Sequence, residues 1–80
     1  MDIADTKTLG KLIRQHRKGL GLTQLDAAGL CGVGERFLSE LERGKDSASL
    51  GKTLQVIKRL GLKVEIDGYL PLPDGIDEGA

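Results

Sequence analysis

Charged and hydrogen-bonding side chains are concentrated in residues 35–45 of this 80-residue chain, which read ERFLSELERGK. If this stretch is helical, Leu38 and Leu41 mark its buried side. The opposite side then carries side chains with different patterns of donors and acceptors: Glu35, Arg36, Ser39, Glu40 and Arg43. Such a face could read the edges that base pairs present in the major groove of DNA.

Arg36 is the strongest candidate for a base contact, because its guanidinium fork matches the two acceptors of guanine. Glu35 or Glu40 could accept a hydrogen bond from the amino group of cytosine. Phe37 lies at the edge of the same face and has two interpretations. It touches a thymine methyl group, or it packs against the neighbouring helix, and the sequence leaves both open.

A helix over residues 23–31 precedes this stretch and is expected to position it. Thr23 can cap that helix, and Gly32 can take the positive φ angle that ends it and starts a sharp turn. Val33 is apolar within the turn, so we expect it to fill the angle between the two helices. The amides at the start of this helix, with the side chain of Gln24, can bind a phosphate.

The second helix is expected over residues 34–43, where Gly34 is the cap and Gly44 ends the helix. Glycine at this cap position costs only a few tenths of a kcal/mol relative to a serine or threonine cap. Gly29 lies inside the first helix, where glycine costs about 1 kcal/mol relative to alanine. Gly29 therefore predicts either a tight contact with another part of the chain or a less stable helix over residues 23–31.

Another helix is expected over residues 6–18, capped by Asp5 or Thr6, after a frayed N-terminus over residues 1–5. One apolar stripe of this helix faces the core. The basic residues fall on its other faces: Lys7, Lys11, Arg14 and Lys18.

A fourth helix is expected over residues 50–60, capped by Ser47 or Ser49. It carries two adjacent apolar stripes, namely Leu50, Leu54 and Ile57 and, beside them, Thr53, Val56 and Leu60. A helix with two apolar faces has more surface to bury than its own domain covers. Part of it is therefore expected in a subunit interface.

The sequence changes period at residues 62–67, where Leu62, Val64 and Ile66 alternate with charged residues, as in a half-buried strand. No second strand is found in the chain, and one strand alone is not stable. Pairing with the same strand of another copy would place Lys63 opposite Glu65, which is favourable. We therefore predict a homodimer. Its interface is expected to hold Val56, Leu60, Leu62, Lys63, Val64, Glu65 and Ile66.

Composition limits the class of protein. The chain is long enough for one small domain, over residues 6–61, and has no apolar run that could span a membrane. Residues 67–80 contain four acidic and no basic residues, so the other 66 residues carry 12 basic and 8 acidic side chains, a net charge of +4. A basic body suits a nucleic-acid binder. Residues 68–80 are expected to be an acidic flexible tail or, alternatively, an arm that binds a partner through its apolar residues.

The sequence offers nothing that supports an enzyme, a cofactor or a metal site. His16 is the one histidine, and it is expected at the surface or its boundary. Cys31 is the one cysteine, so no internal disulfide can form, and it is expected in the core. These features predict a cytoplasmic protein.

The spacing of residues 22–45 resembles the lambda-repressor-like, or Xre, family of helix-turn-helix regulators. The family pattern is matched at Thr23, Gln24, Ala27, Ala28, Gly32, Val33, Leu38, Ser39, Glu42 and Gly44. The resemblance implies an all-α bundle of four helices that binds double-stranded DNA at a palindromic operator, with the second helix of the motif in the major groove.

The resemblance also implies roles for individual residues. Base contacts in the family commonly come from the equivalents of Glu35, Arg36 and Glu40. Phosphate contacts commonly come from the equivalents of Gln24, Arg43 and Lys45. An arginine of the first helix often pairs with the glutamate before the final glycine, and these are Arg17 and Glu42 here. With the residue-level argument, the expected base contacts are Glu35, Arg36, Phe37, Ser39 and Glu40, and the expected phosphate contacts are Thr23, Gln24, Arg43 and Lys45.

The chain is more narrowly similar to HipB-type antitoxins, in its loop and helix over residues 46–60 and in the alternating segment over residues 62–66. That resemblance implies a transcriptional repressor of its own operon, with a HipA-like serine/threonine kinase toxin as a further partner. Two alternatives stay open. One is a stand-alone or phage-type repressor, and the other is a protein-interaction module without DNA binding.

Overall fold

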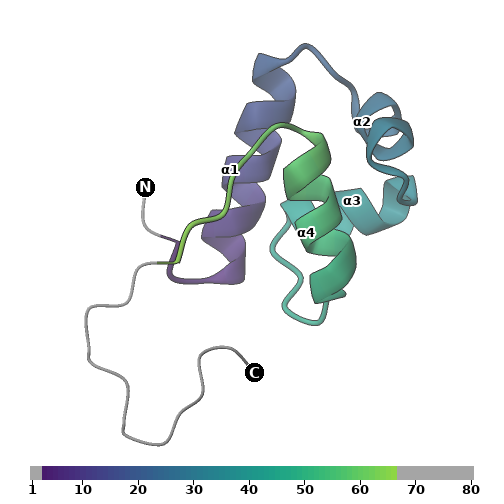
Figure 1. Ribbon diagram of the computed structural model, residues 1–80. Coiled ribbons are helices and arrows are strands. Elements are labelled where there is room, and N and C mark those ends of the chain that lie inside the picture. The colour runs from purple at the N-terminus through teal and green to yellow at the C-terminus, as the bar shows by residue number, and fades with distance from the viewer. Residues whose placement is uncertain (1–2, 67–80) are drawn as a thin grey trace, which may run out of the picture.

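The computed structural model describes residues 3–66, which form four α-helices and no strand (Figure 1). The helices are α1 (Thr6–Gly19), α2 (Gln24–Cys31), α3 (Glu35–Glu42) and α4 (Leu50–Arg59). The predicted all-α class is confirmed for this part of the chain, and each expected helix end lies within about one residue of the observed end. The predictions for residues 1–2 and for the tail at 68–80 lie outside the described residues. No helix in the described part is long and apolar enough to cross a membrane.

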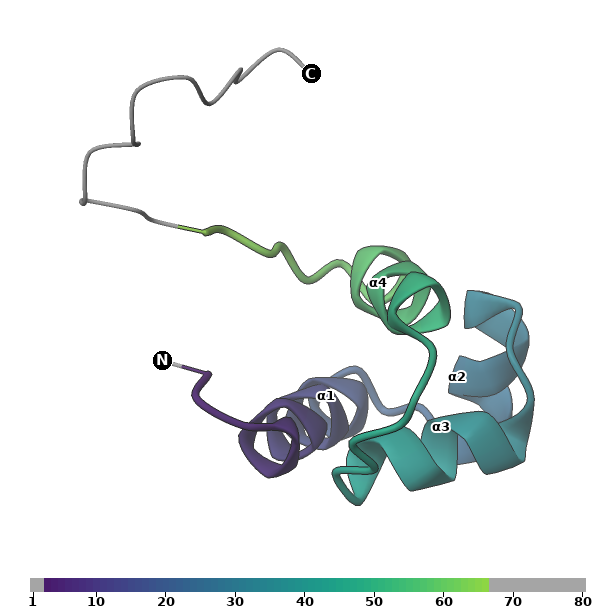
Figure 2. The same ribbon diagram turned by 90° about the horizontal axis from the view of Figure 1, so that it is seen from below.

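The four helices pack around one hydrophobic core, and Figure 2 shows their arrangement. α3 contacts α1 and α2, and α4 contacts α2. The core consists of Ile13, Ala27, Ala28, Cys31, Leu38, Leu41, Val56, Ile57 and Leu60. Val33, in the turn between α2 and α3, packs against this core, and the fixed angle between these two helices follows from that packing.

Local sequence explains where the helices begin. Asp5 and Ser49 cap α1 and α4 with their side-chain oxygens. Thr23 and Asp26 form a capping box at the start of α2, in which each side chain accepts a hydrogen bond from the other residue's amide. Gly34 supplies no side-chain cap to α3. The two helices of the motif therefore differ in how firmly their first turns are held.

Gly10 sets the distance between α1 and α3. A Cβ atom at Gly10 would lie 2.5 Å from the carbonyl oxygens of Leu41 and Glu42. Only glycine permits this approach of the two backbones. A Cβ atom at Gly29 would meet no other atom within 4 Å, so of the two interpretations of Gly29 the tight contact is wrong.

The turn after α3 is fixed against the start of α1. Gly44 has a φ of +89°, and a Cβ there would lie 2.8 Å from the Cα of Lys7. The Thr6 hydroxyl donates a hydrogen bond of 2.8 Å to the carbonyl oxygen of Gly44. Lys7 and Lys45 are consequently held close to the end of α3.

The strand predicted at residues 62–67 is absent from the described residues. Residues 62–66 form no strand: Leu62 packs against the core, and the following residues leave the end of α4 as an irregular segment (Figure 2). Asp67 lies outside the described residues. A strand exists only through hydrogen bonds to a neighbouring strand, and the described part of one chain offers none. Lys63 and Glu65 instead form an ion pair of 3.2 Å within this segment.

Candidate nucleic-acid interface

The outer face of α3 carries the side chains predicted to contact bases. Leu38 and Leu41 are buried and fix the orientation of the helix. Glu35 and Arg36 are exposed, while Ser39 is half-buried. The helix therefore presents a polar face that reaches solvent near its N-terminal end.

Glu40 links two cations on this face. Its carboxylate accepts a hydrogen bond of 3.0 Å from Arg36 Nε and a second of 2.5 Å from Lys45 Nζ. The Lys45 ammonium and then the Arg36 guanidinium hold the pKa of the Glu40 carboxyl below its ordinary value. The Arg36 side chain is 90% exposed, so it can leave Glu40 for another acceptor by rotating its own bonds.

Phe37 is half-buried and packs against the hydrophobic core. The Lys52 ammonium of α4 lies 5.7 Å from the centre of its ring, within the range of a cation–π contact. Part of the Phe37 ring therefore packs inside the domain, as one of the two interpretations expected, and the rest of the ring faces solvent.

The expected phosphate contacts lie at two places around α3. Thr23 and Gln24 are at the start of α2, where the Thr23 hydroxyl accepts a hydrogen bond of 3.0 Å from the Asp26 amide. Arg43 and Lys45 follow the end of α3, and both side chains reach solvent. Arg43 donates to the Ser39 hydroxyl at 3.4 Å, which is a long and weak contact.

Arg17 and Glu42 form a buried, two-pronged ion pair. Arg17 Nε lies 2.7 Å from one carboxylate oxygen of Glu42, and Nη2 lies 2.9 Å from the other. Arg17 Nη1 also donates to the Leu22 carbonyl oxygen at 2.8 Å, and Gln24 Nε2 donates to Glu42 at 3.2 Å. The pair therefore joins α1, the start of α2 and the end of α3.

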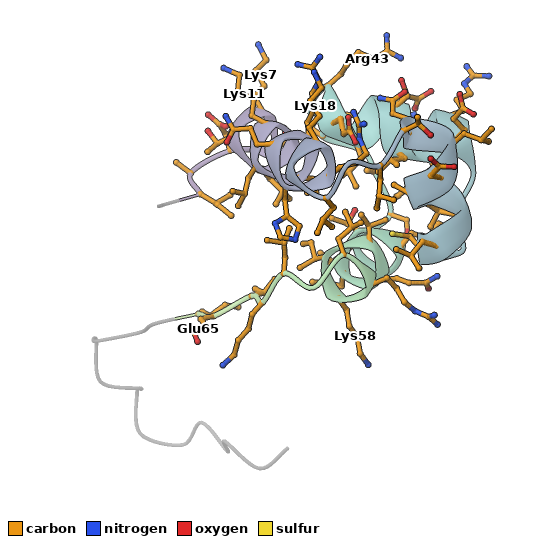
Figure 3. All side chains as sticks on the ribbon, turned by 90° about the horizontal axis from the view of Figure 1, so that it is seen from above. Lys7, Lys11, Lys18, Arg43, Lys58 and Glu65 are labelled. Atoms are coloured by element: carbon orange, nitrogen blue, oxygen red, sulfur yellow. The ribbon has the colours of Figure 1, made fainter. Side chains whose placement is uncertain are left out.

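A basic groove lies between α1 and α3, with a volume of about 450 Å³. Its lining, which defines the α1 groove, consists of Lys7, Lys11, Arg14, Gln24, Ser39, Glu42 and Arg43. Lys7, Lys11 and Arg43 point toward the same side of the molecule, whereas Lys58 points toward the opposite side (Figure 3). Gln24 and Arg43, expected from sequence at separate helix ends, thus share one groove.

A family model for a helix-turn-helix domain matches residues 4–67. The chain belongs to this helix-turn-helix family. An uncharacterized HTH-type transcriptional regulator, y4mF, from Sinorhizobium fredii is 47% identical over 58 residues, which cover 72% of this chain and 76% of the relative. A second uncharacterized HTH-type transcriptional regulator, from Methanothermobacter thermautotrophicus, is 39% identical over 64 residues, which cover 80% of this chain and 93% of the relative.

Solved structures with a similar fold include a HipA–HipB–O2–O3 complex and a HipB–O4 20mer complex. Each matches with a TM-score of 0.78 at 20% identity, over 88% of this chain and 99% of the matched chain. The predicted helix-turn-helix family is confirmed, and the predicted resemblance to HipB is confirmed at the level of the fold. In this helix-turn-helix domain, α2 and α3 are the two helices of the motif.

The helix-turn-helix domain uses two of the predicted interface residues in its own core. Val56 is 0% exposed and Leu60 is 3% exposed, because both face inward between the helices. Their assignment to a subunit interface is therefore wrong. In the other stripe of α4, Leu50 and Leu54 reach solvent, whereas Ile57 is buried.

His16 and Cys31 have structural roles. His16 Nε2 lies 2.7 Å from the carbonyl oxygen of Leu60, so the histidine joins α1 to the end of α4 at the boundary of the core. Cys31 is fully buried, and burial raises the pKa of its thiol. No group of three or more potential metal ligands comes together within residues 3–66.

Sequence reasoning missed Lys7, Lys11 and Arg14 as site residues. Their spacing of four and three residues puts them on one face of α1, and this was visible in the sequence. What the sequence could not supply was the side of the domain on which that face lies. The crossing of α1 and α3 at Gly10 decides it.

Proposed function

We propose that this protein is a sequence-specific, DNA-binding transcriptional repressor. The observation that carries the proposal is the outer face of α3, with Arg36 exposed near its start and the Arg43 side chain reaching solvent at its end. Side chains at the N-terminal end of such a helix reach base edges, while groups around it hold phosphates and set its orientation.

Arg36 is the proposed reader of a guanine, through two hydrogen bonds from its guanidinium. Arg36 is bonded to Glu40 in the unbound chain, so binding would exchange a glutamate acceptor for the acceptors of the base. Glu35, Phe37, Ser39 and Glu40 are proposed to complete the base contacts. Phe37 would do so through the part of its ring that the core leaves exposed.

Contacts to the DNA backbone are proposed for side chains at the start of α2 and after the end of α3. Gln24 donates a hydrogen bond to Glu42 at the start of α2, where the amides of the first helical turn would bind a phosphate. Thr23, Arg43 and Lys45 would act beside it. Lys45 forms an ion pair with Glu40 in the unbound chain, and a phosphate would compete with Glu40 for the Lys45 ammonium group.

A homodimer is proposed through the segment over residues 62–67. Val64 is 50% exposed and Ile66 is 92% exposed, and an antiparallel pairing of two copies would cover both. Such a dimer would bind a palindromic site with half-sites about 34–36 Å apart or a multiple of that spacing. Analytical ultracentrifugation tests it, since the variant I66K should be monomeric at concentrations where the unchanged protein is dimeric.

The narrower proposal is that the protein is the antitoxin of a toxin–antitoxin pair with a HipA-like kinase and represses its own operon. Its support is the fold similarity to HipB, including a chain solved in a complex with HipA. The tagged protein purified from its native cells should bring down a protein with a serine/threonine kinase sequence. Recovery of the homodimer with DNA alone would favour the stand-alone repressor.

DNA recognition is tested by selecting binding sites from a random library of duplexes. The unchanged protein should enrich a palindromic motif, and Arg36→Ala should lose preference at one base pair of each half-site, at a cost of about 1–3 kcal/mol. Lys58→Ala, on the opposite side of the molecule, is the matched control and should enrich the original motif. If neither protein enriches any motif, the proposal fails, and undiminished activity of an Arg36/Arg43 variant in cells would favour an interaction module.

A further inference from the structure

We propose that the α1 groove binds phosphates of the DNA backbone, which makes Lys7, Lys11 and Arg14 DNA contacts. None of these three residues belongs to the expected contact set, which is confined to α2, α3 and the residues that flank them. The inference rests on the proposed function and extends it, because it adds a second surface of the domain to the DNA interface.

The first argument is the unbalanced charge of the groove. Four cationic side chains line it, from Lys7, Lys11, Arg14 and Arg43. The one carboxylate in the lining, that of Glu42, is already bound by Arg17 at 2.7 and 2.9 Å. Within residues 3–66, no carboxylate forms an ion pair with any of the four cations. A single anion entering the groove would therefore meet cations from two helices.

The second argument is the kind of donors that accompany the cations. Gln24 brings an amide beside the first turn of α2, and Ser39 brings a hydroxyl from α3. Cations combined with neutral amide and hydroxyl donors are the usual partners of phosphate oxygens in DNA complexes. Lysines suit such a ligand because their ammonium groups act as point charges on flexible stems.

The third argument is the repeat of the cations along α1. Lys7, Lys11 and Arg14 are spaced by four and three residues and span about 10 Å along the helix. A polyanion with regularly repeated charges can engage such a row at more than one point. A small anion could occupy only one of these positions, so the row favours the backbone of a nucleic acid.

The fourth argument is the position of the groove relative to α3. Ser39 and Arg43 line the groove and also belong to the outer side of α3. Lys7, Lys11, Lys18 and Arg43 all point to this side (Figure 3). With α3 in the major groove, α1 would thus lie over a phosphate strand that borders it, and the two contacts can form together.

The test is the salt dependence of DNA binding for the double variant K11Q/R14Q. Removing one phosphate contact should reduce the slope of log K against log salt by about 0.9. The double variant should therefore lower the slope by about 1.8 per bound protomer. The reduction should appear both on the selected operator and on a random duplex of the same length, and the selected motif should stay the same. Fluorescence anisotropy over a range of about 50–200 mM salt gives the slopes.

The matched control is K58Q/R59Q, which removes the same charge from the exposed side of α4. It should keep the slope of the unchanged protein, and circular dichroism should show both double variants folded. Equal slopes for the K11Q/R14Q variant and the control would overturn the inference while the selected motif still upheld DNA recognition. An unchanged slope together with the loss of a protein partner in cells would overturn it too and assign the groove to an acidic protein. Failure of the unchanged protein to bind any duplex would overturn both proposals.

Discussion

Glu42→Gln should destabilise the fold by about 3 kcal/mol, because it leaves the Arg17 charge buried without a counter-charge. Arg17 and Glu42 are each only 6% exposed. The glutamine retains one acceptor oxygen but turns its amide group toward the guanidinium donors. For a domain of this size, such a loss lowers the melting temperature by about 12–24 °C.

The double variant R17M/E42L distinguishes a paired charge from a generally sensitive position. It removes both charges and fills a similar volume with apolar atoms, and such replacements are often close to neutral. The Leu22 carbonyl oxygen loses its donor from Arg17, which costs about 1 kcal/mol. We therefore expect the double variant to be more stable than Glu42→Gln, with a coupling of at least about 2 kcal/mol between the two positions.

Urea unfolding followed by circular dichroism measures these differences for Glu42→Gln, for the single variants Arg17→Met and Glu42→Leu, and for the double variant R17M/E42L. Glu65→Gln is the matched control, because its ion pair with Lys63 is exposed, and its unfolding midpoint should stay that of the unchanged protein. The reasoning is refuted if Glu42→Gln costs less than about 1 kcal/mol or if the effects of Arg17→Met and Glu42→Leu simply add in the double variant. If a single variant does not fold, a folded double variant still shows that removing the second charge rescues the first substitution.

Two more predictions concern glycine and charge. Gly10→Ala should destabilise the protein by about 1–3 kcal/mol or more, since its Cβ would meet backbone oxygens 2.5 Å away. Gly29→Ala, in an open position of α2, should stabilise it by about 0.5–1 kcal/mol, and thermal unfolding compares the two; similar effects would contradict the packing argument. Glu40 has a lowered pKa, so its ion pairs stabilise the fold above the ordinary pKa of glutamate and are lost only as the pH falls through the lowered value. An NMR titration of the Glu40 carboxyl should show this, and Lys45→Ala should move its pKa back up; a pKa that ignores the lysine would count against the ion pair.

Much of the fold could be predicted from local sequence. Helical periodicity and caps such as Thr23 and Ser49 mark the four helices, because these signals act within one or two turns of the chain. The wrong predictions concern contacts between distant residues. Sequence places Val56 and Leu60 in an interface because two stripes of α4 are equally apolar, and only the packing of the other helices decides which stripe is inside.

The two helical glycines also show that contacts between distant residues cannot be predicted from local sequence. Sequence leaves a tight contact open at Gly29, yet that position has free space, while the close approach of two backbones lies at Gly10. A glycine in a helix has the same local cost wherever it lies, so local reasoning cannot tell which of the two faces another backbone. The basic face of α1 is also visible in the sequence, but only the crossing of α1 and α3 shows on which side of the domain that face lies.

The crossing at Gly10 also connects the stability of the domain with its proposed interface. Glu42 is part of three features at once: the backbone that Gly10 approaches, the buried pair with Arg17, and the wall of the α1 groove. Arg17 balances the negative charge of Glu42, which would otherwise repel a phosphate in the groove. By accepting from Gln24, Glu42 also fixes a side chain at the start of α2. A negative charge beside an anion site is therefore compatible with DNA binding here, because the same pairing that holds the three helices together removes its repulsion.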